Sequence, residues 1–241
     1  MMQRVEVLGL PVDLVSLEQA VARIGEMLES PGTHQVITLN PEYVVRAQGD
    51  PELVQAARES ELVTADGVGI VWAVRQLSKQ QLPERVSGAD LVPALLERFG
   101  PKLRVFFLGA RPGVAQKAAE KARARWGIQV VGVQDGYFKD EAPIVERIAQ
   151  ARPDLLLVGM GERQDLFIYR NKARLGARVA IGIGGMLDVL SGEVKRVHPL
   201  FQRLGLEWLV RIAGDRKRWG RFPRLIQFVR LVQAAKKAHS R

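Results

Sequence analysis

Apolar residues along the middle of this chain come in short runs that alternate with longer stretches of helical periodicity. The runs are rich in Val, Ile and Leu and are bounded by Gly, Pro or Asn, a pattern that predicts buried strands. The predicted strands are His34–Asn40, Glu61–Gly67, Leu103–Ala110, Ile128–Val133, Asp154–Gly161 and Ala177–Gly185.

The stretches between these strands have the length and composition of helices. Pro41 and Pro51 suit first helical turns, with Asn40 and Asp50 before them as N-caps, and a further helix is expected after Gly67. Near-continuous apolar strands separated by helices predict an α/β fold, a Rossmann-like parallel sheet with helices on both faces. The later predicted helices are Ser87–Arg98, Pro112–Arg125, Glu141–Ala151 and Gln164–Arg174.

The pattern changes after Gly192, where two amphipathic helices are predicted over residues 198–214 and 221–241. We therefore expect a sheet domain over residues 1–194 and a basic, helical, membrane-associating appendage over residues 195–241. One apolar face of the last predicted helix comprises Phe222, Leu225, Ile226, Val229 and Val232.

Composition and charge narrow the class of protein. The 241 residues include no Cys, which excludes disulfides, thiolate catalysis and Cys-ligated metals. No apolar run is long enough to span a bilayer and the N-terminus lacks a signal-peptide pattern, so a cytoplasmic protein is expected. Of the net charge of +10, residues 211–241 carry ten bases and one acid. This asymmetry predicts an anionic partner, a membrane surface or nucleic acid, with a solvated helix end as the alternative.

Glycine-rich turns follow three of the predicted strands. In parallel sheets such turns lie at the carboxyl edge, where backbone N–H groups can approach phosphate oxygens. Each turn alone is also explained by steric need for Gly, but three at one edge favour a phosphate-bearing ligand. None matches a P-loop or a dinucleotide-binding fingerprint. The turns are LGARPG with Gly109 and Arg111, VGMGERQ with Gly159 and Gly161, and GIGG with Gly184 and Gly185.

Four polar residues near this edge are candidates for chemistry. Asp66 in TADGVG follows an apolar strand, where it can act as a general base or cap the next helix. Thr38 and Asn40 end the neighbouring strand and can donate or accept hydrogen bonds. Arg85 can bind a diphosphate in bidentate fashion or form a surface ion pair. The three His residues are scattered, without metal-ligand spacing.

These segments, in this order, resemble the WecG/TagA/CpsF family of bacterial glycosyltransferases over about residues 5–230. The combination of the Asp66 motif with Arg-x-x-Gly-x-Asp at Arg85–Asp90 and Gly-Leu-Glu-Trp-Leu at Gly205–Leu209 is specific. The other matching segments are VITLNPEYVVRAQ, VFFLGARPGV, GYF, VGMGERQD and GIGGMLDVLSGEVKR.

The resemblance implies an inverting transferase that moves N-acetylmannosamine, or a related N-acetylhexosamine, from a UDP donor. The implied acceptor is N-acetylglucosamine linked through diphosphate to a polyprenyl lipid, in the biosynthesis of a surface glycan or teichoic acid. The matching segments imply that Asp66 is the base, with Thr38 and Asn40 as polar pocket positions. The substrate-binding positions are Arg85, Gly109, Arg111, Gly136, Tyr137, Gly159, Gly161, Gln164, Gly184, Gly185 and Asp188.

Two departures from the family pattern stand out. The segment that commonly ends Gln-Glu here ends Gln164–Asp165, and Lys195–Arg196 is followed by Val197–His198 where the family often has Ala-Pro. The first is conservative, and the second leaves the geometry of the appendage open.

The mechanism expected from these residues needs no cofactor, and because the chain has no Asp-x-Asp motif we predict transfer without a metal. The basic segment would dock on the inner face of the cell membrane or grip the lipid diphosphate, and close the site as a lid. Two other classes stay open, a nucleic-acid-binding protein with a basic tail and a non-catalytic nucleotide-sugar sensor. The donor sugar, the final glycan and the formation of homo-oligomers are also left open. The candidate arginines of this segment are Arg211, Arg218, Arg221 and Arg224.

Overall fold

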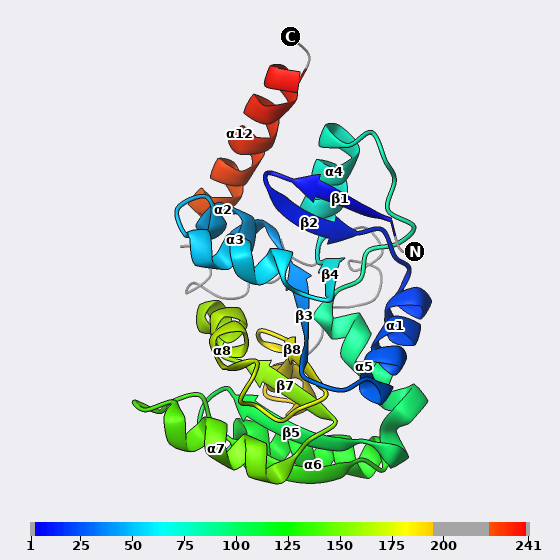
Figure 1. Cartoon of the computed structure of the whole chain (residues 1–241), viewed down its shortest axis with the longest axis vertical. Coiled ribbons are helices and arrows are strands. Elements are labelled where there is room, and N and C mark those ends of the chain that lie inside the picture. Colours follow the sequence, from blue (N-terminus) through cyan, green and yellow to red (C-terminus); the bar gives the residue numbers. More distant parts are fainter. Residues whose placement is uncertain (1–2, 195–221, 240–241) are drawn as a thin grey trace.

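The fold is a six-stranded parallel sheet covered by helices, with a small hairpin at its margin (Figure 1). The computed structural model describes residues 3–194 and 222–239. Strand order is β4-β3-β8-β7-β5-β6, and every pairing is parallel. The strands are β3 (His34–Leu39), β4 (Leu62–Ala65), β5 (Arg104–Gly109), β6 (Gln129–Gln134), β7 (Leu155–Gly159) and β8 (Val179–Gly182).

The sheet is buried on both faces because each central strand is almost wholly apolar. Alternate residues of one strand pack into different cores: Phe107 of β5 faces the cluster beneath α1, α5 and α6, while Phe106 faces that beneath α7 and α8. Figure 1 shows α1 and α5 on one side of the sheet and α2, α3 and α8 on the other. These helices are α1 (Leu17–Glu29), α2 (Pro41–Ala47), α3 (Pro51–Arg58), α5 (Gly88–Phe99), α6 (Val114–Trp126), α7 (Ala142–Ala151) and α8 (Gln164–Asn171).

The expected α/β class and all six predicted strands are confirmed. Helix starts follow the predicted caps: Asn40 accepts a hydrogen bond from the Tyr43 backbone N–H, and Asp50 accepts one from Glu52. Short connecting elements complete the body. They are α4 (Val68–Leu77), α9 (Met186–Leu190) and the 3₁₀ turns η1 (Gly100–Lys102) and η2 (Gly161–Arg163).

The antiparallel hairpin of β1 (Arg4–Val7) and β2 (Leu10–Asp13) is not signalled by the apolar pattern. It is attached to the sheet by Asp13, which is almost fully buried. This carboxylate accepts a 2.8 Å hydrogen bond from the Val63 N–H of β4 and bonds of 2.7 and 2.9 Å from Arg4. This buried carboxylate therefore fixes the hairpin beside β4, beyond the edge of the sheet.

The C-terminal helix α12 (Phe222–His239) packs on α2 and α4, at the end of the molecule opposite α6 and α7 (Figure 1). The predicted apolar face of this helix is partly wrong. Phe222 and Ile226 are 47% and 41% exposed, whereas Phe228, outside the prediction, is fully buried with Val232. Leu225, Phe228, Val229 and Val232 follow the i, i+3, i+4, i+7 pattern, and Ile226 lies about 100° from Leu225 around the helix.

Candidate active site

The carboxyl ends of all six parallel strands lie at one edge of the sheet, and the predicted site residues follow them. The chain leaves β5 toward β6 on one side and leaves β7 toward β8 on the other, so the order reverses between β5 and β7. Ligands of open α/β sheets bind at such a switch point.

A cavity of about 590 Å³ lies at this reversal, where β5, β6 and β7 end. Its volume is in the range of small-molecule sites. Six predicted substrate-binding residues line it: Arg111, Gly136, Tyr137, Gly159, Gly161 and Asp188. The other lining residues are Ala110, Phe138, Lys139, Met160 and Arg163.

Close backbone contacts join the three turns beside the cavity. The Ala110 N–H donates to the Gly159 carbonyl at 2.9 Å, and the Gly136 N–H donates to the Ala110 carbonyl at 3.0 Å. Gly109 has a φ of +127°, and a Cβ there would lie 2.3 Å from the Gly159 oxygen. A Cβ on Gly136 would lie 3.3 Å from the Gly109 Cα. Glycine therefore has a steric role at these positions, because it lets the three turns approach one another closely.

The rim of the cavity carries cations and one exposed aromatic ring. Tyr137 is 73% exposed, and its backbone N–H donates to Asp135 Oδ1 at 2.9 Å. Arg163 Nη2 donates to the Gly136 carbonyl at 2.8 Å. Arg111 and Lys139 add positive charge, with Arg111 Nη2 3.9 Å from Glu193 Oε2. A ring beside several cations suits a planar base attached to phosphate.

Asp66 lies at the other end of the same edge, directly after β4. The backbone N–H of Asp66 donates to the Leu39 carbonyl at 2.8 Å, and Asp66 is half-buried. The N-cap of α4 is Gly67, with a φ of 92°, and no side chain caps this helix. Helix capping therefore does not explain Asp66, and its role as the general base stays a prediction.

Thr38 and Asn40 make contacts that hold the strand ends in place. Thr38, 8% exposed, donates its hydroxyl to the Gly182 carbonyl at 3.1 Å and so ties β3 to β8. Asn40 accepts from the Tyr43 N–H at 3.0 Å as the cap of α2. Both side chains reach the edge, and both have an architectural role there.

Arg85 and Gln164 also bind within the protein. Arg85 Nη2 lies 3.2 Å from Asp90 Oδ2, the ion pair that was the alternative to diphosphate binding. The same carboxylate accepts a 2.7 Å bond from the Ser87 hydroxyl. Gln164 Oε1 accepts from the Gly184 N–H at 2.8 Å and shapes the turn after β8.

The edge thus has two separate parts. Asp66, Thr38, Asn40, Arg85 and Gln164 do not line the cavity, and neither do Gly109, Gly184 and Gly185. β3 and β8 stand between β4 and β7, so three strand spacings separate Asp66 from the Gly159 turn, or roughly 14 Å. The turn after β8 occupies the intervening position.

Asp165 lies beside the site, and in the sequence it stands out only as a departure from the family's Gln-Glu. Its side chain is buried, and a Cβ on Gly182 would lie 2.3 Å from Asp165 Oδ1. Burial raises the pKa of this carboxyl to about 7, against smaller lowering effects of Arg46 and Gln164. An acid directly under β8 therefore titrates near neutrality.

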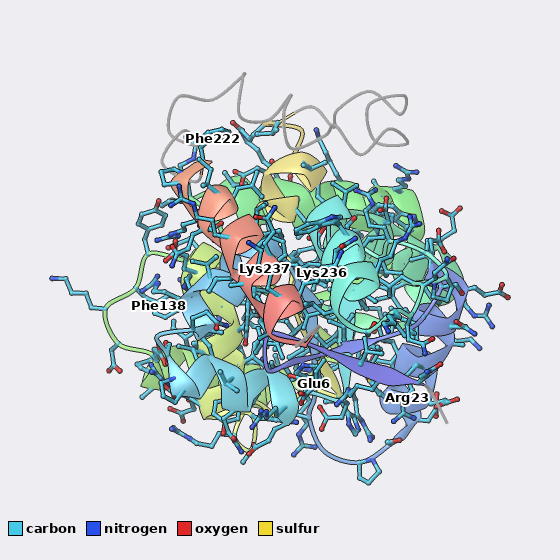
Figure 2. All side chains as sticks on the ribbon, turned by 90° about the horizontal axis from the view of Figure 1, so that it is seen from above. Glu6, Arg23, Phe138, Phe222, Lys236 and Lys237 are labelled. Atoms are coloured by element: carbon cyan, nitrogen blue, oxygen red, sulfur yellow. The ribbon has the colours of Figure 1, made fainter. Side chains whose placement is uncertain are left out.

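Of the four candidate arginines of the basic segment, Arg211, Arg218 and Arg221 lie outside the described residues. Arg224, in the first turn of α12, donates to Glu42 at 2.6 Å and also to Glu162. Arg224 therefore forms ion pairs with the body of the protein. Figure 2 shows α12 running from Phe222 to Lys236 and Lys237.

The described residues contain neither a cluster of metal ligands nor a membrane-spanning helix. Within residues 3–194 and 222–239, no three His, Asp or Glu side chains gather closely enough to hold a metal ion. Of the helices in the part of the chain that the structure describes, none has the length and apolarity to cross a bilayer. Transfer without a metal stays a prediction.

Comparison with known proteins identifies a family and a relative of this chain. Residues 5–241 match the model of the glycosyl transferase WecG/TagA/CpsF family. The chain is 32% identical over 209 residues to a protein of Bacillus spizizenii named N-acetylglucosaminyldiphosphoundecaprenol N-acetyl-beta-D-mannosaminyltransferase. That alignment covers 86% of this chain and 81% of the relative.

Proposed function

The chain belongs to the WecG/TagA/CpsF family and is a glycosyltransferase, and we propose that it transfers N-acetylmannosamine from UDP to a lipid-linked acceptor. The acceptor is N-acetylglucosamine joined through diphosphate to undecaprenol, by analogy with the relative's name. The product is an early intermediate of a surface glycan or teichoic acid. The nucleic-acid-binding and non-catalytic alternatives lose their support, because the matched family and relative are transferases.

The observation that carries the donor assignment is the cation-rimmed cavity at the switch point of the sheet. In this proposal the uracil ring stacks on Tyr137, a residue that is 73% exposed. The diphosphate lies over the glycine turns, where backbone N–H groups and Arg111 offset its charge. The hexose then extends along the edge past Gly184 toward β3 and β4.

The acceptor half of the proposal rests on Asp66. The acceptor hydroxyl attacks the anomeric carbon, its proton passes to the Asp66 carboxylate, and the bond between that carbon and the UDP oxygen breaks. In-line displacement inverts the anomeric centre. Asp66 lies three strand spacings, or roughly 14 Å, from the Gly159 turn. This distance leaves room for the diphosphate and the hexose between the cavity that would bind uracil and the Asp66 carboxylate. Thr38 and Asn40 fix the strand ends beside it.

A lipid-linked acceptor requires the enzyme to work at a membrane face, and an anionic surface suits the basic C-terminal segment. Each cation near such a surface contributes about 1 kcal/mol. On α12, Arg230, Lys236 and Lys237 are exposed. Because Phe228 and Val232 are buried in the body, truncation before α12 would expose core. Replacing these three cations by Gln is therefore the cleaner test, and liposome co-sedimentation should fall.

The activity itself is tested by incubating the protein with a panel of UDP-N-acetylhexosamines and a soluble short-chain analogue of the diphosphate-linked acceptor. We expect UDP release to be fastest with UDP-N-acetylmannosamine, to require the acceptor, and to persist in EDTA. UDP release that is independent of the acceptor, or absent with every donor, would overturn the proposal.

A further inference from the structure

The 3₁₀ turn η2, which follows β7, joins the C-terminal helix to the nucleotide cavity through two consecutive charged residues. Glu162 pairs with Arg224 of α12 and lies 3.6 Å from Arg46 Nε of α2. Arg163, the next residue, donates to the Gly136 carbonyl, in the turn that precedes Tyr137. Two neighbouring side chains thus bind two different parts of the molecule.

The Glu162 contacts form a network of two acids and two bases. Arg224 Nη1 reaches both Glu162 and Glu42, and its partners lie 62 and 182 positions away in the sequence. Arg224 is the main cause of the lowered pKa of Glu162, and Glu162 in turn raises the pKa of Arg224. Isolated surface pairs contribute little, but networks that bridge separate elements contribute more. The start of α12 is therefore held against η2.

The contacts of Arg163 hold the turn that carries the exposed ring. Its guanidinium carbon lies 6.0 Å from the centre of the Phe138 ring, in addition to the 2.8 Å bond to Gly136. Gly136 and Phe138 flank Tyr137 in sequence, so Arg163 contacts the residue on either side of it. Gly161 and Arg163 themselves line the cavity. Figure 2 shows Phe138 on the loop at the flank of the molecule.

We propose that Glu162 and Arg163 are positioning residues through which α12 sets the shape of the nucleotide cavity. The inference rests on the proposed function, since it takes UDP as the occupant of that cavity. Coupling between two sites is reciprocal, so a nucleoside diphosphate in the cavity also strengthens the docking of α12 on the body. A shift of α12 at the membrane would then change nucleotide affinity without touching the nucleotide.

The test is calorimetric titration of UDP into the full chain as wild type, Glu162→Gln, Arg224→Gln and the double variant. Each single change should raise the Kd for UDP about three- to tenfold, the range of a modest coupling. The double variant should be no weaker than either single one, because both break the same link. Arg170→Gln, which breaks a surface ion pair with Glu52 away from α12 and the cavity, is the matched control and should bind UDP within about twofold of wild type.

Two further measurements separate positioning from simple destabilisation. The Tm without UDP should be nearly unchanged in the single variants, while the KM for the donor rises and kcat holds. Arg163→Lys should retain part of the affinity that Arg163→Met loses, since a lysine can still donate to the Gly136 carbonyl and a methionine cannot.

The outcomes distinguish the coupling from the function on which it rests. The coupling alone would be overturned if Glu162→Gln and Arg224→Gln bound UDP with wild-type affinity. It would also be overturned if their effects on the Kd for UDP multiplied in the double variant. A wild-type protein that binds no UDP would overturn the proposed function and the coupling together.

Discussion

The two parts of the sheet edge are built in opposite ways. Where β5, β6 and β7 end, three glycine turns meet through backbone hydrogen bonds and leave a cavity of about 590 Å³. Where β3 and β4 end, polar side chains follow the strands, and the Thr38 hydroxyl donates to the Gly182 carbonyl of β8. In the first part backbone contacts join the turns, and in the second a side chain ties two strands together.

This difference matches the two tasks of a glycosyltransferase. A nucleoside diphosphate is held by many weak contacts to backbone and cations, for which turns without side chains are suited. Proton removal needs one carboxylate at one position, for which Asp66 after β4 is suited. We expect substitutions in the glycine part to change donor binding or folding, and substitutions around Asp66 to change turnover.

The largest effect is expected for Asp66→Asn, which keeps the shape of the side chain and removes the base. A general base contributes on the order of 10²–10⁴ in rate, so kcat should fall by that factor while the Kd for UDP stays at the wild-type value. Steady-state transfer and calorimetric titration measure the two quantities. A variant with near wild-type kcat would end the assignment.

Next in size is Gly109→Ala, in the glycine part. The new Cβ would lie 2.3 Å from the Gly159 oxygen at a φ of +127°, and overpacking of this kind lowers the free energy of unfolding by about 1–3 kcal/mol. Gly113→Ala is the control, because it too has a positive φ but no atom within 4 Å of a Cβ. Urea unfolding should show a larger loss of unfolding free energy for Gly109→Ala than for Gly113→Ala. Equal losses would mean that the positive φ, and not the contact with Gly159, destabilises the variant.

A smaller effect is expected for Tyr137→Ala, which removes the exposed ring. Stacking of a base on an aromatic side chain is worth about 1–3 kcal/mol, so the KM for the UDP-sugar should rise about tenfold with kcat preserved. Tyr137→Phe keeps the ring and should stay close to wild type. A loss of kcat without a change of KM would show that Tyr137 does not stack on the uracil ring.

The last expected effect concerns stability and not activity: it is a pH slope due to Asp165, which lies beside β8 between the two parts. The carboxyl ionises near its ordinary value of 3.8 when unfolded and at about 7 when folded. Between these values the folded protein binds more protons, so stability falls as pH rises, by up to about 1.4 kcal/mol per unit, and levels off above pH 7.

Asp165→Asn removes this slope. The stability of the variant relative to wild type should therefore increase from pH 5 to pH 7.5, as urea unfolding at both values can measure. A relative stability that is constant over this range would show that Asp165 is ionised throughout in the folded protein.

Local patterns in the sequence predicted much of the fold, because the signals of parallel sheets are short-range. Apolar runs located all six strands, and Asn40 and Asp50 located two helix starts. The hairpin of β1 and β2 escaped notice: its strands have four residues each, and its turn places Leu8 and Gly9 at positive φ without the usual Asn or Asp.

The candidate site was predictable where it follows strand ends and not where it depends on distant contacts. The turns at Gly109 and Gly159 could be located from sequence because they follow predicted strands, while Gly136 was indicated only by the family resemblance. The pairing of Arg224 with Glu162 could not, because it joins α12 to the turn after β7. The same holds for Asp165, whose pKa depends on how deeply α8 packs against β8.

The most direct test of the central claim, that one edge binds the nucleotide and presents the sugar to Asp66, is a structure of Asp66→Asn with UDP-N-acetylmannosamine bound. The account predicts the uracil ring against Tyr137, the diphosphate over the glycine turns, and the anomeric carbon facing position 66. A nucleotide bound at the β3 and β4 end, or a hexose pointing away from position 66, would contradict it.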